Sequence, residues 1–171
     1  EVPDTASSNN KRIWTDEKTG IISSWEDFEK YPWPDLDDLD FGMFEKVPKM
    51  LPEGMGLLVC PSSGFFEIPL NRLLGYENMS YLMYDDPKLV ETVFDKVGNF
   101  LLGWYQRLIE LDIDNLIGFF QGDDMGYKTS TMVSPDFLKK NVLIWHKKLA
   151  ELAHTNEMIY ILHSCGNLKD I

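Results

Sequence analysis

A histidine and a cysteine stand two residues apart near the end of the sequence, as His163 and Cys165 in "ILHSCGN". The apolar run before them favours an extended chain, in which residues i and i+2 point to the same side. An imidazole nitrogen and a thiolate sulfur together suit zinc, which keeps one open position in catalytic sites. His163 and Cys165 are therefore predicted zinc ligands. Two ligands do not make a site, and the alternative is a packed turn with a buried cysteine.

The residues after this pair predict the start of a further helix. Asn167 with Asp170 three residues later is a plausible helix cap. The positive end of such a helix would lower the pKa of the Cys165 thiol and favour the thiolate.

Three carboxylates are further candidates for catalysis, namely Asp123, Asp124 and Glu67. The aspartate pair follows a second apolar run and could supply a metal ligand, a substrate anchor or a base. A turn in which these aspartates bond backbone amides, with Gly122 and Gly126 at the bends, is the alternative. Glu67 lies between two large apolar residues and needs a partner or a function there, unless its side chain turns to solvent.

Other reactive residue types are predicted to be structural. Cys60 reads as a small core residue at a strand end, and His146 and His154 as surface residues of a lysine-containing helix. The acidic run over residues 35–40 reads as a solvated face, because it lacks the glycine and glutamate of a calcium loop.

These residues need a scaffold that brings distant segments together. Three short apolar runs, at residues 54–60, 115–124 and 157–164, are typical of strands buried on both faces. Helical patterns separate them, the longest at 87–113 and another at 136–154, which Ser134 and Pro135 open. The longest follows a cap at Asp85-Asp86, begins with Pro87 and repeats apolar residues at Leu89, Val93, Val97, Leu101, Tyr105 and Leu108. This alternation predicts an α/β fold with parallel strands, whose carboxyl ends share one rim where ligands bind. Glu67, the aspartate pair, His163 and Cys165 would all face that rim.

The number of strands suggests part of a barrel. An eight-stranded (β/α)8 TIM barrel takes about 250 residues, so residues 56–171 are predicted to form a partial barrel. A doubly wound sheet is the alternative, although no glycine-rich phosphate turn follows a strand. Residues 1–55 are predicted to form an N-terminal extension, with a β-hairpin from 12–15 and 21–23. A short helix over 25–30, capped by Ser24, and a helical pattern over 36–51 follow it.

Composition narrows the function classes. The chain has 171 residues and a formal net charge of -12, which argues against nucleic acid as a partner. Two cysteines give no disulfide framework and favour a reducing, cytoplasmic location. No apolar run reaches the roughly 18 residues of a membrane span. The sequence begins with Glu1 and reads as a piece of a longer protein, whose open sheet edges favour pairing with another chain, including a homo-oligomer.

Several segments together resemble the uroporphyrinogen decarboxylase superfamily. They are "GFFEIPLNRLLGYENMSYLMYDDPKLVETVFDKV", "GDDMGYKTSTMVSPDFLKKNVLIWHKKLAELAH" and "ILHSCGN", in that order over about residues 56–171. The resemblance implies an eight-stranded α/β barrel with its cleft at the carboxyl rim. In the corrinoid-dependent methyltransferases of this superfamily an H-x-C-G supplies two zinc ligands, and a later cysteine, which this sequence does not contain, supplies the third.

The resemblance implies an enzyme acting on a small-molecule substrate. We expect a zinc-dependent methyltransferase that moves a methyl group between a corrinoid, which a corrinoid protein could carry, and a thiol. One alternative is a metal-free uroporphyrinogen decarboxylase of porphyrin biosynthesis, a lyase that needs basic groups to hold its anionic substrate. Another is a non-catalytic, corrinoid-binding barrel.

Overall fold

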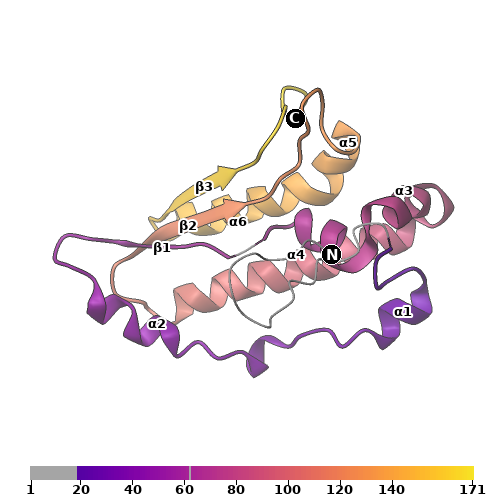
Figure 1. Cartoon of the computed structure of the whole chain (residues 1–171). Coiled ribbons are helices and arrows are strands. Elements are labelled where there is room, and N and C mark those ends of the chain that lie inside the picture. The colour runs from indigo at the N-terminus through magenta and orange to yellow at the C-terminus, as the bar shows by residue number, and fades with distance from the viewer. Residues whose placement is uncertain (1–18, 62) are drawn as a thin grey trace, which may run out of the picture.

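Three parallel strands of the described residues form one open sheet. The computed structural model describes residues 19–61 and 63–171, and its sheet has the order β1-β2-β3 (Figure 1). The strands are β1 (Leu57–Val59), β2 (Leu116–Gly122) and β3 (Ile159–His163), each within a predicted apolar run. Both pairings are parallel. The predicted α/β class with parallel strands is confirmed.

Helices connect each strand to the next, as predicted. Between β1 and β2 lie the π-helical turn η3 (Pro69–Leu74), α3 (Tyr76–Asp85) and the long α4 (Pro87–Glu110). Between β2 and β3 lie α5 (Pro135–Leu138), the π-helical turn η4 (Lys139–Leu143) and α6 (Ile144–Thr155). Helices α4 and α5 start in the same way, with a side-chain cap followed by proline: Asp86 accepts from Leu89, and Ser134 accepts from Phe137.

The N-terminal extension departs from prediction in two places. The first arm of the predicted hairpin lies outside the described residues, and residues 21–23 are not a strand; instead Ile22 is buried and donates its N–H to the Leu73 carbonyl at 2.8 Å. The expected helix over 36–51 is broken into η1 (Leu36–Asp38), α2 (Met43–Lys46) and η2 (Pro48–Met50). Gly42 and Pro48 interrupt it. By contrast, α1 (Trp25–Lys30) forms as predicted, with Ser24 as its cap.

The core lies between the sheet and one layer of helices. Helices α4 and α6 run along one side of the sheet, and the N-terminal segment follows the far side of α4 (Figure 1). The apolar stripe predicted on α4 is buried along its whole length, comprising Leu89, Val93, Val97, Leu101, Tyr105 and Leu108. It packs with Phe119 of β2 and with Leu149 and Ala153 of α6 in one cluster.

The other face of the sheet is open, which corrects the expectation of strands buried on both faces. Leu58 of β1 and Ile159 and Ile161 of β3 are 38%, 48% and 38% exposed. Residues alternate between faces along a strand, so these side chains point away from the helix layer. None of the helices in the described part of the chain combines the length and apolar character needed to cross a membrane.

Candidate metal centre

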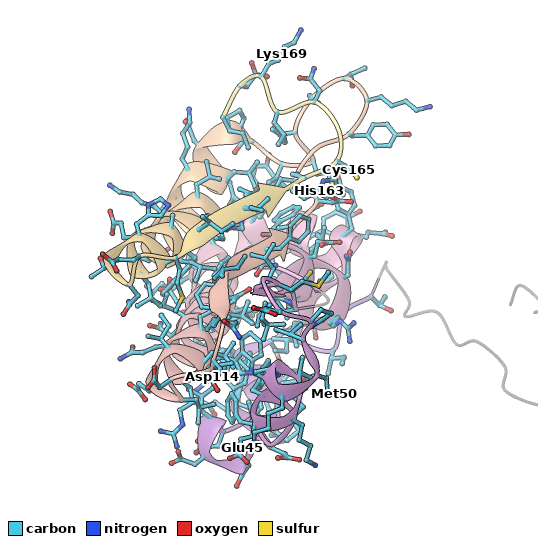
Figure 2. The ribbon with its side chains drawn as sticks, turned by 90° about the vertical axis from the view of Figure 1, so that its left-hand side faces the viewer. Glu45, Met50, Asp114, His163, Cys165 and Lys169 are labelled. Carbon is cyan, nitrogen blue, oxygen red and sulfur yellow. The ribbon has the colours of Figure 1, made fainter. Side chains whose placement is uncertain are left out.

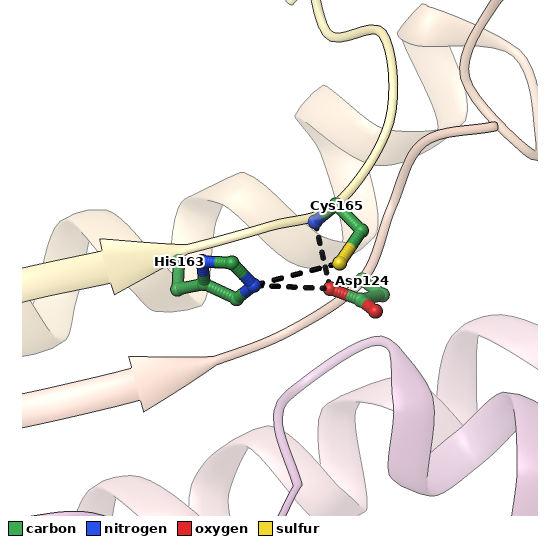
Figure 3. A group of neighbouring side chains, drawn as sticks. All are labelled: Asp124, His163 and Cys165. Carbon is green, nitrogen blue, oxygen red and sulfur yellow. Dashed lines mark hydrogen bonds and ion pairs between the residues drawn. The ribbon is translucent and has the colours of Figure 1, made fainter. Parts of the chain in front are cut away.

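Asp124, His163 and Cys165 converge at the carboxyl ends of β2 and β3 (Figure 3). Their ligand atoms all lie within 4.8 Å of one another. The Cys165 Sγ is 3.5 Å from His163 Nε2, which is 3.9 Å from Asp124 Oδ1. Figure 2 shows His163 and Cys165 together, well away from Asp114, which precedes β2 at the opposite end of the sheet. The predicted pair therefore shares a site with one of the predicted carboxylates.

The sheet itself sets the positions of these side chains. In the parallel register Gly122 pairs with His163, and the next residue, Asp123, donates its N–H to the His163 carbonyl at 2.9 Å. Since consecutive strand residues face opposite sides, Asp123 points to the helices and Asp124 to the open face. The Cys165 N–H then donates to Asp124 Oδ1 at 2.7 Å, which holds the backbone of the cysteine against the carboxylate.

The loops after β2 and β3 are bonded to each other beside the site. Met125 donates its N–H to Ser164 Oγ at 2.9 Å, and Asn167 donates its N–H to the Tyr127 carbonyl at 2.7 Å. Gly166 makes this close approach possible: its φ is +87°, and a Cβ there would lie 2.3 Å from a backbone carbon of the other loop. Gly166 of "HSCG" therefore allows the backbone conformation that holds Cys165 at the site.

The donor set fits a zinc ion. Zinc–sulfur and zinc–nitrogen bonds of about 2.3 and 2.0 Å at a tetrahedral angle place the two ligand atoms about 3.5 Å apart. The sulfur and imidazole nitrogen are 3.5 Å apart. A nitrogen and an oxygen ligand should be about 3.4 Å apart, so the 3.9 Å between His163 and Asp124 closes with a small rotation. The His163 and Asp124 side chains are 56% and 42% exposed, which leaves the site open to a substrate.

The environment of Cys165 corrects one prediction. The hydrogen bond with Asp124 raises the pKa of the Cys165 thiol, and burial and the charges of Asp124 and Glu67 act in the same direction. No helix begins in residues 164–171, and Asn167 Oδ1 instead accepts from the Lys169 N–H in a turn. The expected pKa lowering by a helix N-terminus is therefore wrong. A bound cation is the influence that would favour the thiolate here.

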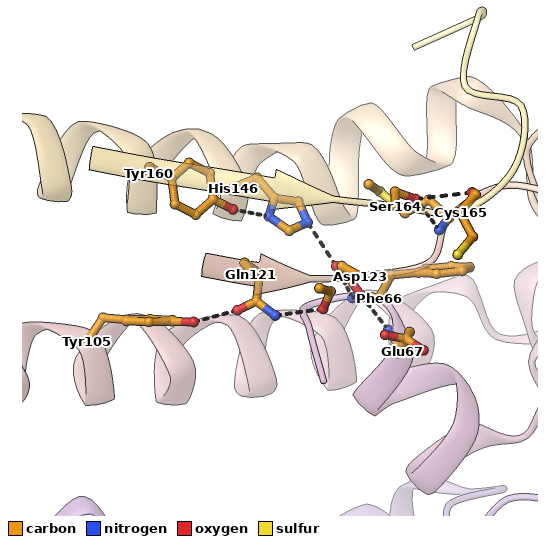
Figure 4. Close-up of polar contacts among 11 residues, drawn as sticks. Phe66, Glu67, Tyr105, Gln121, Asp123, His146, Tyr160, Ser164 and Cys165 are labelled. Carbon is orange, nitrogen blue, oxygen red and sulfur yellow. Dashed lines mark hydrogen bonds and ion pairs between the residues drawn. The ribbon is translucent and has the colours of Figure 1, made fainter. Parts of the chain in front are cut away.

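Asp123 is a buried structural carboxylate rather than a rim residue (Figure 4). Its two oxygens accept from the N–H groups of Phe66, at 3.1 and 2.9 Å, and Glu67, at 2.9 Å. His146 Nε2 lies 2.8 Å from its Oδ2. The two aspartates that the sequence presented as equivalent thus face opposite sides of the sheet.

His146 is the functional candidate that sequence reasoning missed. It is 4% exposed, so its assignment to the surface is wrong, whereas His154 is exposed as predicted. The signal was the helical spacing: Val142, Leu149 and Ala153 lie at positions −4, +3 and +7 from His146, and all three are buried. The neighbouring Lys147 and Lys148 lie on the opposite, solvated face of the helix, and they suggested the wrong assignment.

Glu67 is partly buried beside the metal centre. Burial raises the pKa of its carboxyl group, and the negative charge of Asp123 adds to this, while a hydrogen bond from the Asp124 backbone N–H opposes it. The carboxyl therefore neither turns freely to solvent nor sits in the core. It is a partly dehydrated acid next to one of the candidate ligands, a setting that suits proton transfer.

Cys60 does not join the site. It is exposed, so the expectation of a small core residue is wrong. The reason is that β1 ends at Val59 and the chain leaves the sheet there. Its sulfur contacts the Pro61 carbonyl at 3.5 Å.

Gly64 allows the turn after β1 to close over Asp123. A Cβ at Gly64 would lie 2.2 Å from the Asp123 Cγ, a carbon that its surroundings hold in place. We expect Gly64→Ala to lower the free energy of unfolding by about 2 kcal/mol through overpacking. Gly122→Ala is the matched control, because its Cβ would meet nothing within 4 Å. Urea unfolding measures both, and equal stability of the two variants would contradict the close packing of this turn.

Comparisons with protein-family models, with curated proteins and with solved structures found no match for this chain.

Proposed function

We propose that the chain forms the metal-binding part of a zinc-dependent methyltransferase related to the uroporphyrinogen decarboxylases. The observation that carries the proposal is the convergence of Asp124, His163 and Cys165 at one end of a parallel sheet. Carboxylate, imidazole and thiolate are all zinc ligands, and three protein ligands with one open position are typical of catalytic zinc. The sequence motif and the separation of the donor atoms agree on this site.

The fold proposed with it is part of an eight-stranded barrel. In such a barrel the helices lie outside and the opposite face of the sheet lines the interior. The open face here carries exposed apolar residues and, at its carboxyl end, the three donors. A substrate approaching that face would meet the metal directly.

The residues of this chain would hold the metal and accept one proton from the acceptor thiol. Asp124, His163 and Cys165 would hold the zinc, which when bound would lower the pKa of an acceptor thiol and favour its thiolate. Glu67 is placed to take up the thiol proton on its carboxylate, since its raised pKa makes it a stronger base than an ordinary glutamate. The thiolate sulfur would then bond to the methyl carbon of the proposed donor, a methylated corrinoid, as the cobalt–carbon bond breaks and leaves its electron pair on the corrinoid.

The metal-free decarboxylase gains little support from the described residues. It requires cations at the rim, yet Arg107 lies near the end of α4, which leads into the amino end of β2. There it forms an ion pair with Glu110 at 3.5 Å. Arg72 is exposed.

Metal analysis and a transfer assay test the proposal. We expect the purified protein to bind one zinc ion per chain and to catalyse methyl transfer from methylcobalamin to a small thiol. Zinc chelation should stop the reaction and added zinc should restore it. Failure to bind zinc, or turnover of uroporphyrinogen by the metal-free protein, would overturn the proposal.

A further inference from the structure

A buried histidine connects the helix layer to β3, to the carboxyl end of β2 and to the turn after β1 (Figure 4). His146 of α6 uses both ring nitrogens: Nε2 lies 2.8 Å from Asp123 Oδ2, and Nδ1 lies 2.7 Å from the Tyr160 hydroxyl on β3. The edge of the ring packs against Phe65, with centroids 4.9 Å apart. These contacts fix the position and the orientation of the imidazole.

Asp123 links α6 to the turn after β1. Its carboxylate receives the N–H groups of Phe66 and Glu67, in the turn after β1, and the contact from His146 on α6. The aspartate is fully buried, so each of these bonds replaces water that the carboxylate has lost. Rotation of the Asp123 side chain away from these donors would leave them buried and unpaired, which is costly.

The metal centre lies on the other side of the same backbone. Asp124 follows Asp123, and the two side chains must face opposite sides of the sheet. Holding Asp123 on the helix side therefore holds Asp124 towards His163 and Cys165. The same carboxylate also places the Glu67 backbone beside Asp124.

We propose that His146 is a positioning residue of the Asp124–His163–Cys165 metal site, orienting Asp124 and Glu67 through Asp123. This inference rests on the proposed metal-binding function. Outer residues that orient metal ligands typically contribute 10- to 100-fold to metal affinity. His146 touches neither the metal ligands nor the open face, so it is not a catalytic residue.

A buried hydrogen bond elsewhere on β2 provides the matched control. Tyr105 of α4 donates its hydroxyl to Gln121 Oε1 at 2.6 Å, and both side chains are fully buried. Gln121 lies on the same face of β2, two residues before Asp123. Tyr105→Phe removes a buried hydrogen bond of the helix layer without removing any of the hydrogen bonds to Asp123.

Titration with Co²⁺ separates positioning from general stability. We expect His146→Leu to weaken Co²⁺ binding about tenfold and to alter the visible absorption bands of the bound ion. His146→Gln, whose amide can still donate to Asp123, should restore the affinity to within about threefold of the unaltered protein. Tyr105→Phe should lower the unfolding midpoint in urea yet leave both the affinity and the spectrum unchanged.

The outcomes distinguish this inference from the function on which it rests. No Co²⁺ binding by the unaltered protein would overturn the metal site and the role of His146 together. Unchanged affinity in His146→Leu, or an equal loss in Tyr105→Phe, would overturn the role of His146 alone. If His146→Leu does not fold, Tyr160→Phe replaces it: it removes one hydroxyl, and an affinity unchanged from the unaltered protein would overturn the inference.

Discussion

Cys165→Ala is expected to abolish tight metal binding, whereas Cys60→Ala leaves it unchanged. Both cysteines are free and exposed, so the two substitutions remove the same atom from similarly accessible places. Cys165 lies 3.5 Å from the imidazole nitrogen that would share its metal, while Cys60 contacts a backbone carbonyl. The difference between the variants therefore reports the site and not the loss of a thiol.

The size of the effect follows from the donor set. Removing the sulfur leaves one imidazole and one carboxylate, and zinc sites in proteins use three or four ligands. Because even outer partners of a ligand contribute 10- to 100-fold, loss of a direct ligand should weaken binding by more than about 100-fold.

Spectroscopy with Co²⁺ measures this result directly. A thiolate ligand gives cobalt an intense charge-transfer absorption, which should vanish in Cys165→Ala and persist in Cys60→Ala. Calorimetric titration with Zn²⁺ gives the affinities of both variants. Retention of the absorption in Cys165→Ala, or its loss in Cys60→Ala, would show that the assigned sulfur is the wrong one.

Local sequence signals predicted most of the scaffold. The caps of α1 and α4, the proline at the start of α4, and the apolar stripe along that helix are set by residues within a few positions of one another. The i, i+2 spacing likewise placed His163 and Cys165 on one side of a strand. Such features depend on strand and helix periodicity, which the sequence contains in full.

Features set by distant contacts could not be predicted in this way. The pKa of Cys165 depends on Asp124, 41 positions earlier in the chain, and the apparent helix start after it is a turn. The third metal donor depends on the register of β2 and β3, which decides that Asp124 rather than Asp123 faces the site. His146 is an intermediate case, because its helical spacing indicated burial while its lysine neighbours suggested the surface.

Asp123→Ala is expected to destabilise the protein by about 3–5 kcal/mol, because it leaves several buried donors without an acceptor, at about 1–3 kcal/mol each. The substitution leaves the N–H groups of Phe66 and Glu67 and the His146 ring without their shared acceptor. Asp124→Ala, one residue later, removes a carboxylate that is 42% exposed. It breaks the hydrogen bond from Cys165, at a cost of about 1 kcal/mol.

The effects on metal binding should run in the opposite order. Asp124→Ala removes a ligand and should weaken Zn²⁺ binding strongly in a folded protein. Urea unfolding of the metal-free variants gives the stabilities, and calorimetry under conditions where each variant is folded gives the affinities. Should Asp123→Ala not fold, Asp123→Asn keeps the volume and one acceptor oxygen and should show a smaller loss in the same direction. If Asp124→Ala proved the more destabilising of the two, the assignment of one aspartate to the core and the other to the site would be wrong. The expected pattern would show that the two adjacent carboxylates have separate roles, because neighbouring residues of a strand face opposite sides of the sheet.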